Sequence, residues 1–186
     1  MRIISGEARG RRFSLPKRSS IRPTSDRIKE ALFNILHPLT GRVFLDIFAG
    51  SGNVGLEALS RRASRVVFIE RNAILAGAIK KNVMEFGFRE RCETLTMEVG
   101  RGIRELVARG ERFDILFIDP PYERDLIEKT LQHLEDGALF LDDARIVIQH
   151  SAKETLPKTL SNRYILTDQR KYGYTRLSFL KPISGE

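Results

Sequence analysis

Short apolar runs alternate with amphipathic segments along most of the chain. The runs are read as continuous apolar strands rather than alternating ones, and they lie at residues 43–48, 66–69, 94–97, 115–118 and 146–148. A continuous apolar strand is covered on both faces, and the segments between these runs have helical periodicity. The pattern therefore predicts an α/β domain with a mostly parallel sheet wound with helices.

The last two apolar segments predict a different connection. Residues 163–168 and 174–180 are separated by only a few residues around Tyr172 and Gly173. So short a connection joins antiparallel strands, because parallel strands need a long crossover. We therefore expect a mostly parallel seven-stranded sheet with an antiparallel C-terminal strand at or near one edge.

The N-terminal segment predicts an extension of this domain. Residues 2–5 and 12–15 have the pattern of two short strands around a turn that contains Gly6 and Gly10. This β-hairpin is too small to be stable unless it packs on something else. After a polar loop, Thr24 can cap a helix. The apolar positions of that helix are spaced three and four residues apart, at Ile28, Ala31, Leu32, Ile35 and Leu36.

Length and composition agree with one folded domain. The chain has 186 residues, of which 41% are apolar, and we expect a hairpin and helix extension at 1–40 and a single compact domain at 41–183. The N-terminus lacks the apolar run of a signal peptide and no segment could span a membrane, so we expect a cytoplasmic protein. Cys92 is the single cysteine and has no ligand spacing with the histidines, so no metal site is predicted.

Positive charge is concentrated at the start of the chain. The whole chain carries a formal net charge of +8. Residues 1–30 contain nine basic and three acidic side chains, which leaves +6 for this segment. Such a cluster favours a polyanionic partner such as nucleic acid, although a solvated surface is the simpler explanation of an isolated group of arginines.

A glycine-rich loop follows the first strand of the predicted sheet. Gly50, Gly52 and Gly55 have the spacing of a dinucleotide-binding fingerprint, and Glu70 ends the next strand. Because the loop lies between a strand and a helix, it predicts a nucleotide-type cofactor at the carboxyl ends of the strands. The alternative is a set of glycines that only make a tight turn.

Asp46, at the end of the first strand, indicates which cofactor binds. A dinucleotide would bring its pyrophosphate to the start of the following helix, where the Asp46 carboxylate would repel it. S-adenosylmethionine carries an ammonium and a sulfonium there instead, and helix amides after Gly52 can meet its carboxylate. Glu70 can accept hydrogen bonds from both ribose hydroxyls, unless it is a surface acid paired with Arg71.

The end of the third strand is the predicted adenine position. This strand is expected to end in Met97, Glu98 and Val99. Glu98 could accept a hydrogen bond from the adenine amino group, and Val99 could offer its backbone amide. Glu98 could equally be the first acidic residue of the following helix.

The fourth strand runs into an Asp-Pro-Pro-Tyr segment at residues 119–122. The two prolines remove two backbone donors and stiffen the chain, which leaves carbonyl acceptors. The Asp119 carboxylate and the Pro120 carbonyl could hold the two protons of an exocyclic amine and direct its lone pair at a methyl donor. Tyr122 could stack on a flipped base. On its own, the tetrapeptide could also be a turn after a buried strand.

These motifs together resemble a known family. Class I methyltransferases carry the first-strand motif found at residues 45–52, an acid at the position of Glu70, and the Asp-Pro-Pro-Tyr motif of amino methyltransferases. Glu98 stands where we would expect Asp or Asn, which leaves the adenine contact open. Nearly the whole chain is similar to the bacterial RsmD family, through residues 2–6, 9–11, 22–27, 31–34 and 55–61.

The resemblance implies a Rossmann-like class I methyltransferase that modifies the exocyclic N2 of a guanine in small-subunit ribosomal RNA. The methyl donor would be S-adenosyl-L-methionine, with S-adenosyl-L-homocysteine as the product and no metal. The expected partner is ribosomal RNA within an assembled or nearly assembled small subunit, with no membrane partner, and we expect the enzyme to be a monomer.

The motifs, the charge and the resemblance assign roles to particular residues. The expected catalytic residues are Asp119, Pro120, Pro121 and Tyr122. The expected cofactor-binding residues are Asp46, Phe48, Gly50, Ser51, Gly52, Glu70, Arg71, Glu98 and Val99. The candidate substrate-binding residues are Arg9, Arg11, Arg12, Arg22, Thr24 and Arg27.

Other functions stay open at this point. Related Asp-Pro-Pro-Tyr motifs serve adenine N6, cytosine N4 and glutamine, so a DNA adenine-N6 methyltransferase or another amino methyltransferase is an alternative. The short chain leaves little room for a DNA-reading domain. A nicotinamide-dependent dehydrogenase is opposed by Asp46, whereas an RNA-binding ribosome-assembly factor would need only the basic N-terminal segment.

Overall fold

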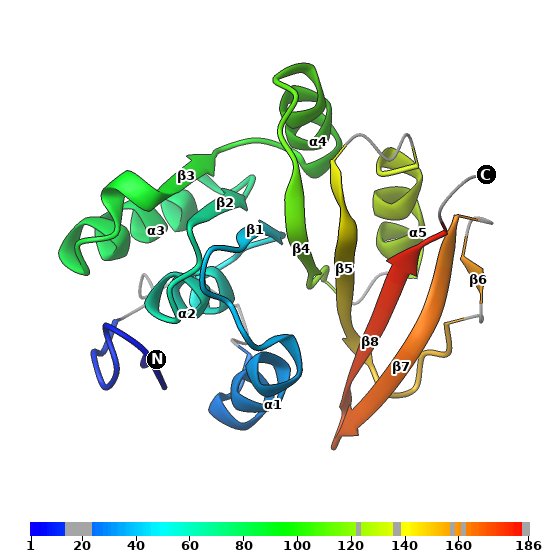
Figure 1. The fold of residues 1–186 in the computed structure, drawn as a ribbon, viewed down its shortest axis with the longest axis horizontal. Helices are drawn as coiled ribbons and strands as arrows, with labels where there is room; N and C mark the ends of the chain where they lie inside the picture. Colours follow the sequence, from blue (N-terminus) through cyan, green and yellow to red (C-terminus); the bar gives the residue numbers. More distant parts are fainter. Residues whose placement is uncertain (14–23, 122–123, 136–138, 157–158, 161–162, 184–186) are drawn as a thin grey trace. The chain divides into compact units, whose positions relative to one another are not determined.

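The computed structural model describes residues 1–13, 24–121, 124–135, 139–156, 159–160 and 163–183. The chain forms two compact units, Met1–Glu98 and Val99–Glu186, each with its own strands and helices (Figure 1). No helix among the described residues is long and apolar enough to cross a membrane. The predicted division into an extension at 1–40 and a domain at 41–183 stays a prediction.

The first unit has parallel strands in the order β3-β2-β1. The strands are β1 (Val43–Ile47), β2 (Arg65–Ile69) and β3 (Cys92–Leu95). The helices are α1 (Asp26–Leu36), α2 (Asn53–Ser60), α3 (Ala73–Glu85) and the short 3-10 helix η1 (Arg89–Arg91). Residues 44–47 and 66–69 are buried, as the continuous apolar pattern predicts for strands covered on both faces.

The third strand ends earlier than predicted. Leu95 is its last residue and pairs with Ile69, which is the last residue of β2. Beyond Leu95 the chain has no β2 residue to pair with, so Met97 and Glu98 lie outside the strand. Val99 is the first residue of the next helix rather than part of the strand end.

The N-terminal elements agree with the predictions in outline and differ in detail. A single antiparallel bridge joins Arg2 to Arg12 in place of two strands, and residues 14–15 of the second predicted strand fall outside the described residues. Helix α1 is capped by Ser25, whose hydroxyl accepts a hydrogen bond from Ile28 N at 3.4 Å, and not by Thr24. Thr24 is buried, and its predicted capping role is wrong by one position.

The second unit has strands in the order β4-β5-β8-β7-β6. Strand β4 (Phe113–Ile118) pairs in parallel with β5 (Phe140–Ser151). Strand β8 (Thr175–Pro182) lies between β5 and β7 (Tyr164–Tyr172) and is antiparallel to both. Strand β7 therefore runs in the same direction as β5, and their arrowheads point the same way in Figure 1.

The antiparallel C-terminal strand is thus confirmed. The described residues contain eight strands rather than the predicted seven, because the two-residue β6 (Thr159–Leu160) pairs with the outer side of β7. So short a strand leaves no recognisable apolar run in the sequence. The helices of this unit are α4 (Val99–Ala108) and α5 (Arg124–His133).

Candidate functional site

The loop between β1 and α2 has the backbone conformations that its glycines allow. Gly50 and Gly52 have φ values of +54° and +70°, in the left-handed region that glycine tolerates. Phe48 has a φ of +62°, which is uncommon for a residue with a side chain and costs about 1–3 kcal/mol. Such strain is concentrated at functional sites, which agrees with the prediction that this loop binds a cofactor.

Gly55 has a different role from the other two glycines. It lies inside α2, and a Cβ atom at this position would come within 2.2 Å of the Phe68 ring on β2. Glycine is therefore required so that α2 can approach the strand closely, which is the role of the third glycine in dinucleotide-type folds. The spacing of Gly50, Gly52 and Gly55 thus combines a tight turn with close packing.

The Asp46 carboxylate is buried at the start of α2. Its Oδ2 accepts a hydrogen bond from Gly55 N at 2.9 Å, and Asp46 is only 2% exposed. The N-cap residue of α2 is Gly52, which has no side chain, so Asp46 supplies the capping oxygen from the neighbouring strand. Its negative charge also stabilises the positive end of the helix dipole.

The Glu70 carboxylate closes the same loop from the end of β2. Oε2 accepts from Gly50 N at 2.8 Å, and Oε1 accepts from Asn72 N at 2.7 Å. Glu70 is buried, whereas Arg71 lies 3.5 Å from Glu98 in an exposed pair. Glu70 is therefore not a surface acid paired with Arg71, and the structure brings it directly to the glycine loop.

The remaining predicted cofactor residues differ in exposure. Ser51 is buried, and its hydroxyl accepts from Asn53 N at 3.3 Å. Asn53 N and Gly55 N therefore already have acceptors within the first unit, although the sequence assigned helix amides after Gly52 to the cofactor carboxylate. Glu98 is exposed and paired with Arg71, so no described contact fixes it in the predicted adenine-binding position.

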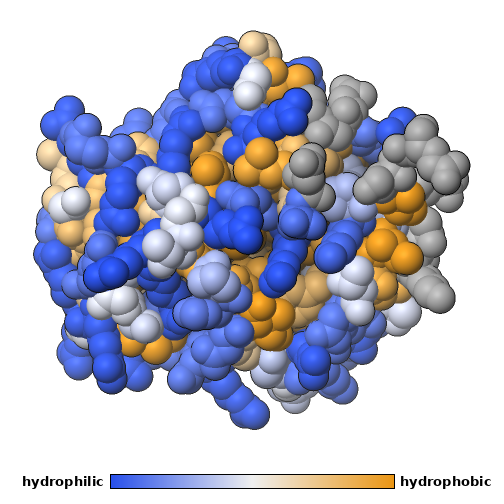
Figure 2. Space-filling view, viewed as in Figure 1, coloured by the Kyte–Doolittle hydropathy of each residue, from blue (hydrophilic) through white to orange (hydrophobic). Residues whose placement is uncertain are grey.

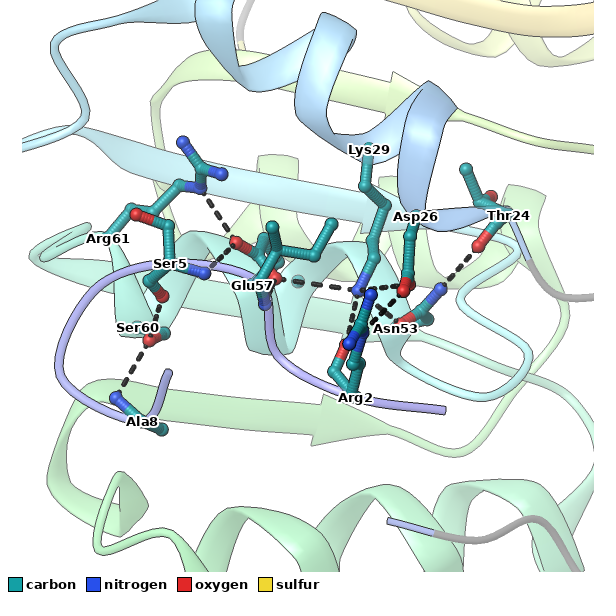
Figure 3. A network of polar contacts seen from close by, with 12 residues as sticks. Arg2, Ser5, Ala8, Thr24, Asp26, Lys29, Asn53, Glu57, Ser60 and Arg61 are labelled. Atoms are coloured by element: carbon teal, nitrogen blue, oxygen red, sulfur yellow. Dashed lines mark hydrogen bonds and ion pairs between the residues drawn. The ribbon is translucent and has the colours of Figure 1, made fainter. Parts of the chain in front are cut away.

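A buried polar network lies beside this loop and was not predicted (Figure 3). Lys29 Nζ donates to Asn53 Oδ1 at 2.9 Å and to the Arg2 carbonyl at 2.7 Å, and it lies 3.4 Å from Glu57 Oε2. Burial lowers the pKa of Lys29, while Glu57 opposes that shift. Glu57 also binds Arg61 at 2.8 Å. The available signal was a lysine directly next to Ile28 on the apolar face of α1.

The N-terminal arm, residues 1–13, is bound to α2 by this network. Glu57 accepts from the backbone nitrogens of Ile4 and Ser5 at 2.8 and 3.0 Å. Ser60 Oγ accepts from Ala8 N at 2.9 Å and donates to the Ser5 carbonyl at 2.6 Å (Figure 3). The packing that the small hairpin needs is therefore supplied by α2.

The candidate substrate-binding residues lie in different settings. Arg9, Arg11 and Arg12 are exposed, but Arg11 also donates to the Glu85 carbonyl at 2.5 Å and stacks over the Phe86 ring. Arg27 is exposed on α1, whereas Thr24 is buried and its carbonyl accepts from Asn53. Arg22 falls outside the described residues.

In the second unit, Asp119 follows the last residue of β4. Gln149 on β5 donates from Nε2 to Asp119 Oδ2 at 2.9 Å, and Gln149 is buried. Pro120 is buried and Pro121 is exposed, while Tyr122 falls outside the described residues. Gln149 was missed by the sequence analysis. Its only signal was a polar side chain directly after the apolar run at 146–148.

No three His, Cys, Asp or Glu side chains gather into a metal site in the described parts of the chain. Burial and the neighbouring Glu93 raise the pKa of Cys92 to about 11, so this thiol is a poor metal ligand and nucleophile at neutral pH. That the protein needs no metal stays a prediction.

Comparisons with known proteins agree on the fold and the family. Residues 1–181 match a family model described as Conserved hypothetical protein 95. The chain is 36% identical over 163 residues to ribosomal RNA small subunit methyltransferase D of Escherichia coli K12, covering 87% of this chain and 80% of that protein. A protein of the same name from Haemophilus influenzae is 34% identical over 150 residues, with coverage of 80% and 78%. The structure of the Escherichia coli protein yhhF has a TM-score of 0.86 at 31% identity and covers 100% of this chain and 99% of that one.

Proposed function

The chain belongs to the RsmD family, described as Conserved hypothetical protein 95, and on that premise we propose that it methylates the exocyclic N2 of a guanine in small-subunit ribosomal RNA. Relatives that cover most of the chain are named ribosomal RNA small subunit methyltransferase D. The proposal includes S-adenosylmethionine as the methyl donor and an assembled or nearly assembled subunit as the substrate. It also includes a monomer that acts in the cytoplasm without a metal.

The cofactor is assigned to the first unit. Asp46 near the end of β1 and Glu70 directly after β2 are buried carboxylates on neighbouring parallel strands, and each accepts a hydrogen bond from a backbone amide at the start of α2 or in the glycine loop. Glu70 suits the two ribose hydroxyls, and the charge of Asp46 favours the cationic part. Phe48, Gly50, Ser51 and Gly52 form the loop, while Arg71, Glu98 and Val99 are assigned with it. When bound, S-adenosylmethionine supplies a methyl group that is already activated by its sulfonium.

The amine is assigned to the second unit, and the single observation that carries this step is the Asp119–Gln149 hydrogen bond. An amine attached to an aromatic ring is a poor nucleophile, because its lone pair is delocalised into the ring. Asp119 and the Pro120 carbonyl would accept its two protons and favour a pyramidal nitrogen. Gln149 holds Asp119 Oδ2 at 2.9 Å, which restricts the carboxylate to one orientation. Tyr122 would stack on the base, and positioning provides most of the rate acceleration.

The exposed arginines are assigned to the RNA. Arg9, Arg12 and Arg27 are free of the stacking that holds Arg11 on Phe86, so they are the stronger candidates for phosphate contacts in the described part of the chain. Arg22 and Thr24 are assigned with them. Phosphate contacts of this kind make affinity fall as the salt concentration rises. Each contact on single-stranded RNA contributes about −0.7 to the slope of the logarithm of the binding constant against the logarithm of the salt concentration.

A methylation assay tests the proposal. Small ribosomal subunits from a strain that lacks this enzyme are incubated with the protein and S-adenosylmethionine, and their RNA is digested and analysed by mass spectrometry. We expect one additional N2-methylguanosine per subunit. Naked ribosomal RNA and duplex DNA serve as parallel substrates. Methylation of adenine in DNA with none in the subunit would contradict the proposal.

A further inference from the structure

The hairpin formed by β7 and β8 ends in an exposed tyrosine. Tyr172 pairs with Thr175, so Gly173 and Tyr174 form a two-residue turn, and Gly173 has a φ of +61°. A glycine with positive φ at the first turn position is typical of type II′ hairpins. The turn geometry therefore explains Gly173 but not Tyr174. Tyr174 is 79% exposed, so its ring lies in solvent instead of packing on the sheet.

This turn lies at the same edge of the second unit as Asp119. Strand β4 ends at Ile118, which pairs with Ile148, whereas β5 continues to Ser151, which pairs with Thr175. The three additional residues of β5 place the turn roughly 10 Å beyond the end of β4, at about 3.3 Å per residue. Figure 1 shows the hairpin extending past the end of β5. Ligands of such sheets bind at this edge, where the parallel strands end.

Like charges face each other across the hairpin. Lys171 on β7 pairs directly with Arg176 on β8, and a like-charge pair in this position destabilises the two strands. Exposed Lys153 follows the end of β5 and adds a third cation at this edge. The carboxylate of Asp168 is already bound to Arg170 at 2.8 Å, so it does not neutralise them. A polyanion at the tip would remove the repulsion between Lys171 and Arg176.

We infer that the hairpin tip, defined as Lys153, Lys171, Tyr174 and Arg176, is a second RNA-contact surface beside the target nucleotide. Tyr174 stacks on a neighbouring base, and the cations bind the adjoining phosphates. Proteins bind single-stranded RNA through aromatic rings that stack on bases and cations that bind phosphates, and any base can stack because every base has an aromatic face. The inference rests on the proposed function for its substrate class.

The surroundings of Tyr174 favour RNA over an apolar protein partner. A surface that binds a protein partner usually presents several apolar side chains close together. Around the hairpin tip, the space-filling view shows mostly hydrophilic residues (Figure 2). His150 lies opposite Arg176, and its pKa is lowered mainly by burial, which leaves this imidazole uncharged at neutral pH. Glu154 Oε2 lies 3.8 Å from His150 Nδ1, and the Glu154 carbonyl accepts a hydrogen bond from Arg176 at 3.2 Å, so the tip carries Lys153, Lys171 and Arg176 against this neighbouring acid.

Fluorescence anisotropy with a labelled single-stranded oligouridine tests the surface without any methyl transfer. We expect Tyr174→Ala to weaken binding about tenfold, and Tyr174→Phe to bind as the unchanged protein does, because the ring is retained. We expect Lys153→Ala combined with Lys171→Ala to reduce the salt slope by about 0.7 for each lost phosphate contact. Lys80→Ala combined with Lys129→Ala removes the same charge from exposed positions on α3 and α5 and serves as the matched control.

The outcomes separate this inference from the proposed function. If Tyr174→Ala binds oligouridine as tightly as the unchanged protein, or if both lysine pairs alter the salt slope equally, the RNA surface is wrong even where subunits are methylated. If Tyr174→Ala slows subunit methylation without altering oligouridine binding, the tip contacts a ribosomal protein and the inference is overturned. If the hairpin variants lose RNA binding while the unchanged protein methylates no RNA, the surface stands and the proposed reaction fails. Thermal unfolding confirms that each variant is folded.

Discussion

The carboxylates at the ends of the strands are held in different ways in the two units. In the first unit, Asp46 and Glu70 accept hydrogen bonds from backbone amides of the glycine loop and its surroundings. In the second unit, Asp119 accepts from the side chain of Gln149, which lies thirty residues further along the chain. The acids of the first unit are therefore held by the backbone, whereas Asp119 is held at least in part by a side chain that a substitution can remove.

Because of this difference, substitutions of these acids should affect the stability of the first unit and the methyl-transfer step in the second. Removing an acid that caps a helix or closes a loop alters the loop as well as the ligand that the loop binds. Removing Asp119 or Gln149 leaves the glycine loop of the first unit intact. We therefore expect substitutions of Asp46 or Glu70 to alter the loop and cofactor affinity, and substitutions of Asp119 or Gln149 to alter turnover alone.

The largest effect is expected for Asp119→Ala. Turnover should fall about 10²- to 10³-fold, the range for removing one preorganised hydrogen-bonding group from a reacting centre. Affinity for S-adenosylhomocysteine, measured by calorimetry, should stay the same. Asp119→Asn serves as the control, because it keeps an acceptor for Gln149 and removes only the charge. Lost cofactor binding with turnover intact would contradict the role assigned to Asp119.

An intermediate effect is expected at Asp46, where two variants separate two roles. Asp46→Ala should lower the free energy of unfolding by about 1–2 kcal/mol, because Gly55 N loses its acceptor and α2 its cap. Asp46→Asn keeps an acceptor oxygen, so it should be nearly as stable as the unchanged protein in urea unfolding. Both variants should bind S-adenosylhomocysteine more weakly, since both lack the charge. Normal affinity in Asp46→Asn would make Asp46 a purely structural residue.

The smallest effect is expected for Gln149→Met, which removes the donor to Asp119 and keeps a side chain of similar length. Turnover on ribosomal subunits should fall about tenfold, while KM for the cofactor and the thermal midpoint stay close to their original values. Gln169→Met is the matched control, because Gln169 donates to Ser178 in the same unit at 2.9 Å. Equal losses of turnover in the two variants would mean that Gln149 supports the sheet and does not position Asp119.

Most of the fold could be predicted because its signals are local. The continuous apolar runs identified β1, β2, β4 and β5, and the short connection around Gly173 required the antiparallel β8. Where the prediction failed, a partner far along the chain decided the outcome. The third strand stops at Leu95 because β2 stops at Ile69, and no pattern within residues 94–99 contains that information.

The candidate site was also predictable only where its residues have a local sequence signal. Asp46, Gly50, Gly52 and Glu70 could be recognised because the spacing of a loop between a strand and a helix is written directly in the sequence. The buried network of Lys29, Asn53 and Glu57 could not be recognised, since its members come from two helices, α1 and α2, that meet only in the folded unit. The position of Lys29 on the apolar face of α1 is a sign that it is buried, but the sequence does not identify Asn53 and Glu57 as its partners.

By itself, the sequence determined the α/β architecture, the glycine loop with its acids, the Asp-Pro-Pro-Tyr segment and the basic start of the chain. The tertiary structure alone decided that Asp46 caps α2, that Glu57 binds the N-terminal arm, that Gln149 holds Asp119 and that Tyr174 stands exposed beside a like-charge pair. The physical reason is the distance along the chain between the interacting residues. Backbone conformation and burial patterns depend on neighbouring residues, whereas hydrogen bonds and charge pairs between distant side chains exist only after folding brings their elements together.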